Sequence, residues 1–369
     1  MSEVASASED ILKLLQPYID HYGLLDDSTI TIGNLRNAIH PVFQRSNFDT
    51  SKDTYDTLKP ALRLASQFLQ NDALLEWWVQ AGLGQEVSDP TTGQVYLNPP
   101  PKADDPKDNL RTTMMALAEM RYHVRFSFDP LTDVFGHTTI DRTRPSRPKK
   151  NKIFNADFKA ATQIGLSDLF EWWASLYYTS DSTTECQRLR FNFFFAVNIV
   201  HELAHAFGVM RRGGGNAEPC HSRIDMLSST GAEMGWSWEV WTFGGQIAPH
   251  DDFAAPTAML VTAIPLPREV AARGDRKICP VPMWWIGQWF QTSTWQGIEQ
   301  HGRKALPRPP RDLPIQLDDH AEWQLVKAKK RKRDSDVEVT QSISRPLKRR
   351  LWRSNTWAPE TSLSPLLTY

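Results

Sequence analysis

Cysteine is scarce in this 369-residue sequence, which has only three, Cys186, Cys220 and Cys279. They are far apart, odd in number and never spaced as Cys-x-x-Cys. The pattern indicates neither a disulfide framework nor a cysteine-based zinc site. Reduced thiols are typical of intracellular proteins, so we expect an intracellular location, nuclear or cytoplasmic.

Long hydrophobic runs are also missing. The most apolar stretch, at residues 191–200, is interrupted by Asn192 and Asn198 and is too short to span a bilayer, which predicts no transmembrane segment. The first ten residues, MSEVASASED, are polar and acidic, whereas a secretory signal needs a basic start and an apolar stretch. We therefore expect a protein that is not secreted and has no membrane partner. Its 40% of hydrophobic residues can form one large or two modest cores.

The main chemical signal is the pentad His201-Glu202-Leu203-Ala204-His205, which has the pattern HExxH. Residues 185–210 around it contain no proline and repeat large apolar side chains at helical spacing, which predicts a largely buried helix. Two imidazoles four positions apart share one helix face and can bind one metal ion, normally zinc. Glu202 can then act as the general base that accepts a proton from water. The alternative is two core histidines bonded to carbonyl groups or other side chains.

A zinc site needs a third protein ligand. One class of HExxH proteins has a third histidine six residues after the second, but Arg211 stands there, and a guanidinium cannot ligate a metal. In another arrangement a glutamate comes from a second helix, and residues 231–245 form a Trp-rich helical stretch closed by two glycines. The candidates for the third ligand are Glu218, His221, Glu233 and Glu239.

The segments HELAH and GAEMGWSWE together resemble the gluzincin type of zinc metallopeptidase. They resemble more closely a set of uncharacterised, mainly fungal, zincin-like proteins that share HExxH, then AExG-x-SWE and FGG. The resemblance covers residues 110–300 and implies Glu202 as the base. It implies three ligands of one zinc ion: His201, His205 and Glu233. SprT-like DNA-associated proteases are a second comparison, because they use a histidine at about the distance of His221.

Zinc with three protein ligands leaves a position for water, and hydrolysis of a peptide bond is then the default reaction. The predicted function is a zinc-dependent hydrolase, a metallopeptidase with a peptide or protein substrate. If His221 is not a ligand, it is a candidate donor to the oxyanion that forms at the substrate carbonyl. Glu239 and Asp225 are candidates to bond the second ring nitrogens of the two histidines, and Asn198 to line the cleft. Each of these could instead be an ordinary capping or surface group.

The predicted fold class is α+β, predominantly helical. Helical patterns lie at residues 9–22, 58–81, 110–121, 231–245 and 283–300, and strand patterns at 122–128, 153–158 and 258–264. The resemblance implies a zincin-like core with a small sheet, in which the HExxH helix packs against a second helix carrying the glutamate ligand. We expect an N-terminal helical region (1–87), a Pro/Asp-rich loop or linker (88–108), the metallohydrolase core (109–300) and a Pro-rich, basic, largely disordered tail (301–369).

The C-terminal tail differs from the rest of the chain in charge. Residues 327–353 hold eleven Lys or Arg against three Asp or Glu, although the whole chain has a formal net charge of −1. Two basic runs resemble a bipartite nuclear localisation signal or an arm for nucleic acid. They are Lys329, Lys330, Arg331, Lys332 and Arg333, followed by Lys348, Arg349 and Arg350. The predicted partner is a nuclear import receptor or nucleic acid, and the alternative is a solvated tail without a partner.

Three hypotheses about function follow from these patterns. The first is a zinc hydrolase, specifically a peptidase. The second is a SprT-like DNA- or chromatin-associated protease with His221 as third ligand, in which the basic arm is a main functional element. The third is a catalytically inactive zincin scaffold used for partner binding.

Overall fold

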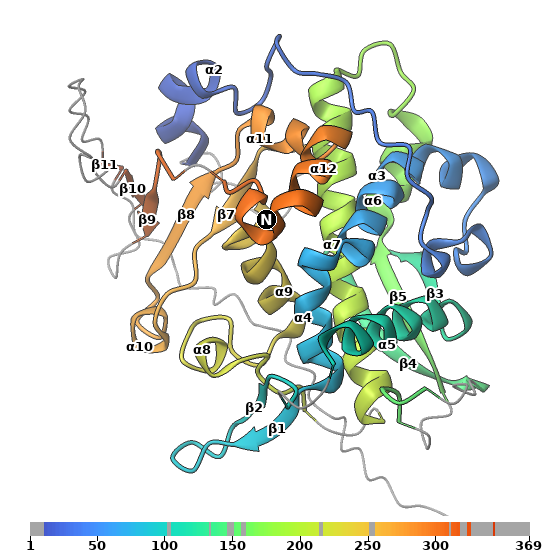
Figure 1. Ribbon diagram of the computed structural model, residues 1–369. Helices are drawn as coiled ribbons and strands as arrows, with labels where there is room; N and C mark the ends of the chain where they lie inside the picture. Colours follow the sequence, from blue (N-terminus) through green and yellow to red (C-terminus); the bar gives the residue numbers. More distant parts are fainter. Residues whose placement is uncertain are drawn as a thin grey trace, which may run out of the picture.

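Figure 1 shows the computed structural model of the protein, in which helices and small sheets surround one long helix, α7. The structure describes residues 11–101, 105–132, 134–145, 151–155, 160–213, 217–250, 255–309, 311–317, 323–325 and 342–343. The fold is mixed, mostly helical with small sheets, which agrees with the predicted class.

Helix α7 spans Glu185–Arg212 and begins with a capping box formed by Thr184 and Gln187. It ends at Gly213, whose φ of 88° is favourable for glycine. Among the described residues, α7 is the one helix that is long and apolar enough to cross a membrane by length and composition, and it is longer than the apolar run at residues 191–200. Of its most apolar window, 78% is buried inside the protein, so packing in the core accounts for its composition.

Helices α3 (Lys52–Gln70) and α4 (Asp72–Leu83) pack beside α7. The sequence pattern indicated a single helix here, but the chain breaks at Asn71, whose backbone is extended and whose side chain accepts from the Ala73 amide. Buried side chains of all three helices belong to one hydrophobic core. The N-terminal helices therefore help to hold α7 in place.

A three-stranded sheet lies on one side of α7 and has the order β3-β5-β4. Strands β3 (Val124–Asp129) and β5 (Ala160–Ser167) are parallel, whereas β4 (Gly136–Pro145) pairs with β5 in the antiparallel direction. Strand β4 is an edge strand of this sheet and contacts α7. The predicted strand at 122–128 is confirmed, while the described part of the segment at 153–158 contains no strand.

A second sheet is an antiparallel meander with the order β11-β10-β9-β8-β7-β6. Its strands are β6 (Gln246–Pro249), β7 (Leu260–Ala263), β8 (Arg276–Pro280), β9 (Ile315–Leu317), β10 (Trp323–Leu325) and β11 (Ser342–Ile343). The remaining helices are α2 (Ile19–Tyr22), α5 (Pro106–Glu119), α6 (Asp168–Leu176), α8 (Arg223–Met226), α9 (Met234–Phe243), α10 (Arg268–Ala271), α11 (Met283–Gln288) and α12 (Thr292–His301). Helix α9 packs against α7.

Several observed elements cross the expected region boundaries, including α5, which begins at Pro106 inside the expected linker. Part of the predicted linker at 88–108 forms β2 (Val95–Asn98), which makes a hairpin with β1 (Gln85–Ser88). The chain also continues to pack beyond residue 301. Leu306 and Ile315 are buried, and β9 pairs with β8. The two predicted basic runs lie outside the described residues.

Candidate metal centre

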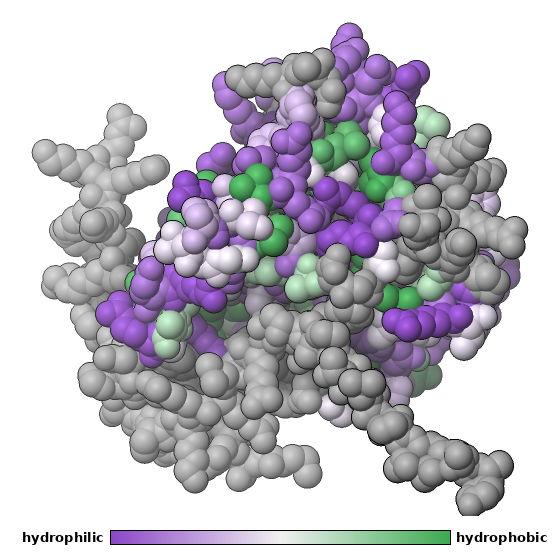
Figure 2. Space-filling model, turned by 90° about the horizontal axis from the view of Figure 1, so that it is seen from below, coloured by the Kyte–Doolittle hydropathy of each residue, from purple (hydrophilic) through white to green (hydrophobic). Residues whose placement is uncertain are grey.

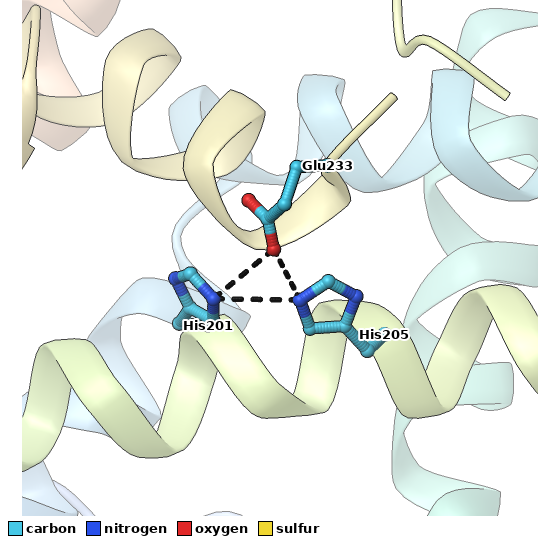
Figure 3. A group of neighbouring side chains, drawn as sticks. All are labelled: His201, His205 and Glu233. Carbon is cyan, nitrogen blue, oxygen red and sulfur yellow. Dashed lines mark hydrogen bonds and ion pairs between the residues drawn. The ribbon is translucent and has the colours of Figure 1, made fainter. Parts of the chain in front are cut away.

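His201 and His205 lie one turn apart on α7, and Figure 3 shows both rings turned toward the Glu233 carboxylate. The two Nε2 atoms are 3.4 Å apart. This closeness follows directly from the four-residue spacing, which places both side chains on one helix face. The expected helix and the expected side-by-side histidines are both present.

Glu233 reaches the histidines as the N-cap residue of α9, with φ −107° and ψ 107°. Its Oε2 accepts from the Trp236 amide and caps the helix. Its Oε1 lies 3.2 Å from His201 Nε2 and also contacts His205 Nε2. One ligand-type atom from each of the three residues lies within 4.8 Å of the others, so this group can hold a metal ion. The expected second helix is present, with the glutamate at its cap and not in its interior.

Gly235 allows α9 to approach this closely. A Cβ atom at Gly235 would lie 2.3 Å from His201 Cδ2 and 2.4 Å from Nε2, which is closer than any real Cβ contact. The backbone of α9 therefore packs directly on the imidazole. The glycine two residues after Glu233 has a steric reason, although the sequence alone did not reveal it.

Two further carboxylates bond the Nδ1 atoms of the histidines. Glu239 Oε1 lies 2.6 Å from His201 Nδ1, and its Oε2 accepts from the Ile247 amide at 2.5 Å. Glu218 lies 2.9 Å from His205 Nδ1 and also accepts from the Met234 amide at 3.2 Å. A carboxylate at Nδ1 fixes the ring orientation and leaves Nε2 free to bind a metal. The role expected for Glu239 is observed, while Glu218, considered as a ligand, bonds a ring nitrogen instead.

Burial and charge oppose each other in this group. Burial by itself lowers the pKa of His201, but Glu233 and Glu239 outweigh it and raise the pKa to about 10. Burial acts in the same way on His205, and its neighbours Glu218 and Glu233 raise its pKa well above the usual value. Burial raises the pKa of Glu233, yet the two imidazoles hold that pKa well below its usual range.

Three carboxylates thus face two imidazoles in a mostly buried space, and the charge balance favours a cation there. A divalent metal ion supplies positive charge while both imidazoles stay neutral. Two imidazole nitrogens and one carboxylate oxygen are also a donor set that zinc binds. The residues present therefore fit a metal ion in donor chemistry, in charge and in the orientation of their rings.

Glu202 is 5% exposed and is fixed by the edge strand β4. Its Oε2 lies 2.8 Å from the Thr138 hydroxyl, which also lies 3.0 Å from the Glu202 carbonyl oxygen. Gly136 in the same strand packs on this side chain, because a Cβ there would lie 2.7 Å from Glu202 Cγ and 2.8 Å from Asn198 Oδ1. Asn198 therefore lies beside the expected base. Sequence reasoning missed Gly136 and Thr138, although the β-branched run TTI at residues 138–140 is a weak strand signal.

His221 and Asp225 are not part of the chelating group. The His221 ring stacks on Trp77 at 4.6 Å, and its Nε2 donates to the Trp77 carbonyl oxygen at 3.0 Å. Asp225 accepts from the hydroxyls of Ser222 and Ser237 at 2.7 and 3.2 Å, and bonds neither His201 nor His205. The structure therefore corrects the expectation that Asp225 bonds a metal-binding histidine. His221 is 4% exposed and packs between Trp77 of α4 and Asp225 of α8, whose Oδ2 lies 4.0 Å from its Nδ1.

No family model, curated protein or solved structure matches this chain. The resemblance to gluzincins therefore depends on the two short segments that carry the site.

Proposed function

We propose that this protein is a zinc-dependent hydrolase of the gluzincin type, with peptide bonds as its class of substrate and a zincin-like core around α7. The observation that carries the proposal is the convergence of His201, His205 and Glu233, from two segments, at the position where the HExxH pattern needs a third ligand. The Nδ1 partners Glu218 and Glu239 give further support, since a structural pair of core histidines would not need a carboxylate behind each ring.

In this proposal His201, His205 and Glu233 hold one zinc ion. When bound, zinc lowers the pKa of a water molecule toward about 7 and polarises a carbonyl group. The chain's own task is then to move protons. Glu202 accepts a proton from the attacking water at its carboxylate and delivers it to the nitrogen of the leaving amine. Thr138 keeps that carboxylate in one orientation by donating to Oε2.

The position of β4 supports an extended polypeptide as the substrate. Strand β4 is an edge of its sheet, and Thr138 in that strand touches the proposed base. An edge strand can pair with an extended peptide through backbone hydrogen bonds, and such pairing accepts many side-chain sequences. A peptide added there would run past Glu202, which is the arrangement that cleavage of a backbone amide needs.

The alternative with His221 as third ligand has less support, because the His221 Nε2 atom already donates to the Trp77 carbonyl. A role for the basic tail with nucleic acid or an import receptor, and a nuclear location, stay predictions from the sequence.

The proposal is tested with Glu202→Gln, which removes the base and preserves size. Hydrolysis of a mixed peptide library, followed by mass spectrometry, should fall by roughly 10²- to 10⁴-fold, while the zinc content should not change. Glu299→Gln, at an exposed position of α12, is the matched control and should retain full activity. A fully zinc-loaded wild-type protein that cleaves no peptide would overturn the proposal and favour an inactive scaffold.

A further inference from the structure

A cavity of about 420 Å³ opens where the C-terminal ends of α4 and α7 lie together. Figure 1 shows both helix ends at the bottom of the molecule, and Figure 2 looks at that side, where the coloured surface is mostly hydrophilic with smaller hydrophobic patches. Gly82 and Leu83 from α4 and Ile153 form its apolar part. Its polar part contains Lys152, Arg211, Arg212 and Glu86. Cationic side chains therefore outnumber anionic ones in the lining.

Arg212 is the unusual residue of this lining. Its side chain is 6% exposed, and its Nε and Nη1 atoms have no hydrogen-bond partner among the described residues. Glu218 Oε1 lies 3.8 Å from its Nη2, which is too far for a hydrogen bond, and Glu86 lines the same cavity. Buried donors that lack an acceptor destabilise a protein, and an unmatched guanidinium does so strongly. A ligand in the cavity that carries hydrogen-bond acceptors would therefore stabilise the Arg212 guanidinium.

The guanidinium of Arg212 is also held in place. A Cβ at Gly208 would lie 3.1 Å from Nη2 and 3.2 Å from Nη1, so the group lies over the backbone of its own helix one turn earlier. Glu218 does not supply the missing acceptors, because its oxygens are held by His205 Nδ1 and the Met234 amide and Oε1 lies 3.8 Å from Arg212 Nη2. The donors of Arg212 are thus fixed before any ligand arrives.

The other two cationic side chains of the cavity differ from Arg212 in their partners and exposure. Arg211 is already used, since Nη2 donates to the Gly84 carbonyl and Nη1 lies 3.3 Å from Glu86 Oε1. Lys152 is exposed at the opening. The C-terminal end of α7 carries a partial negative charge of about half a unit, which opposes an anion. The three positive side chains still outweigh the sum of this partial charge and the two carboxylates of Glu86 and Glu218.

We propose that this cavity binds a small oxyanion, a sulfate, phosphate or carboxylate group, on the Arg212 guanidinium. Arginine donors in a partly enclosed space match the oxygens of these groups in charge and in number. The site lies on the Nδ1 side of His205, behind Glu218, so its ligand is separate from the reacting atoms of a substrate. The proposal does not depend on the hydrolase function.

Isothermal titration of zinc-free wild-type protein with sulfate and with acetate tests it, with chloride at equal ionic strength as background. We expect saturable binding of one anion per chain. Arg212→Gln should weaken it by at least about tenfold, because a charged hydrogen-bond donor is lost. Lys152→Gln, at an exposed position that folding tolerates, should weaken it about two- to threefold.

The matched control is Arg111→Gln on α5, which removes an exposed arginine far in sequence from the cavity and should leave anion affinity unchanged. Saturable binding of either anion that responds in this order supports the site, and the more strongly bound anion identifies the preferred class. Absence of saturable binding by both anions would overturn the proposal. Equal weakening by all three variants would also overturn it, because that result would indicate a general effect of surface charge.

Discussion

The protein buries histidines in two regions that affect them in opposite ways. At the metal centre, carboxylates outweigh burial and raise the pKa of His201 to about 10. Beside α4, His221 stacks on Trp77 and donates to its carbonyl, while the nearest carboxylate oxygen, of Asp225, lies 4.0 Å from Nδ1; burial lowers the pKa of His221 to about 4. Carboxylates in direct contact with the ring nitrogens therefore distinguish the cation-binding histidines from the packing histidine. The His221 side chain is also the more deeply buried, 4% exposed against 15% for His201.

The largest expected effect is on zinc affinity, which should depend on His201 and not on His221. His201→Ala removes a proposed ligand, and we expect zinc affinity to fall by more than about a hundredfold, since even residues behind the ligands are worth 10- to 100-fold. His221→Ala should leave zinc affinity within about threefold and lower the free energy of unfolding instead. Competition with a fluorescent zinc chelator measures the affinity. A larger loss of affinity in His221→Ala than in His201→Ala would contradict the assignment.

The lowered pKa of His221 should make the folded protein less stable in acid. Its folded pKa lies below the unfolded value near 6.5, so its stabilising contribution is complete above pH 6.5 and is lost as the pH falls toward 4. The loss amounts to about 3 kcal/mol. Urea unfolding of wild type and His221→Phe, both with a chelator, should give a smaller fall in the variant. His40, whose pKa burial also lowers to about 4, contributes equally to both proteins and cancels. Parallel pH profiles would refute this interpretation.

The carboxylates behind the ligands should have a smaller effect. Glu239→Gln and Glu218→Gln each keep a hydrogen-bond acceptor and remove a charge, so we expect zinc affinity to fall by roughly 10- to 100-fold. Asp225→Asn is the matched control, because Asp225 bonds serines and not the metal-binding histidines. The same chelator competition applies. Equal losses in all three variants would show that the two Nδ1 partners have no special role.

The smallest effect concerns the approach of α9 to the imidazole. A methyl group at Gly235 would overlap the His201 ring, so Gly235→Ala should lower the free energy of unfolding by about 1–3 kcal/mol and weaken zinc binding. Gly297→Ala is the matched control, since a Cβ at this position in α12 meets nothing within 4 Å. It should stabilise the protein by about 0.5–1 kcal/mol. Similar melting temperatures for both variants would rule out the close contact.

The residues closest to the chemistry were predictable from the sequence, because their signals are local. The spacing of His201 and His205 fixes a shared helix face, and the segment around Glu233 predicts the helix that brings it back. Glu239 followed from the same segment. These side chains occur in the structure as the patterns indicate.

The surrounding residues were not predictable, since their positions depend on contacts between distant segments. Thr138 meets Glu202 only because β4 pairs with β5 beside α7. Glu218 bonds His205 only after the chain has turned back from the end of α7. Asp225, expected to bond a histidine, lies near in sequence but bonds Ser222 and Ser237 instead. Spacing along the chain carries no information about such loop paths.

The most direct measurement of the central claim is anomalous diffraction from crystals of the zinc-loaded protein. We expect a single zinc peak with Nε2 of His201 and of His205 and Oε1 of Glu233 at about 2.0–2.2 Å. A zinc peak beside Cys220 and His221, or no peak among the three proposed ligands at saturating zinc, would contradict it.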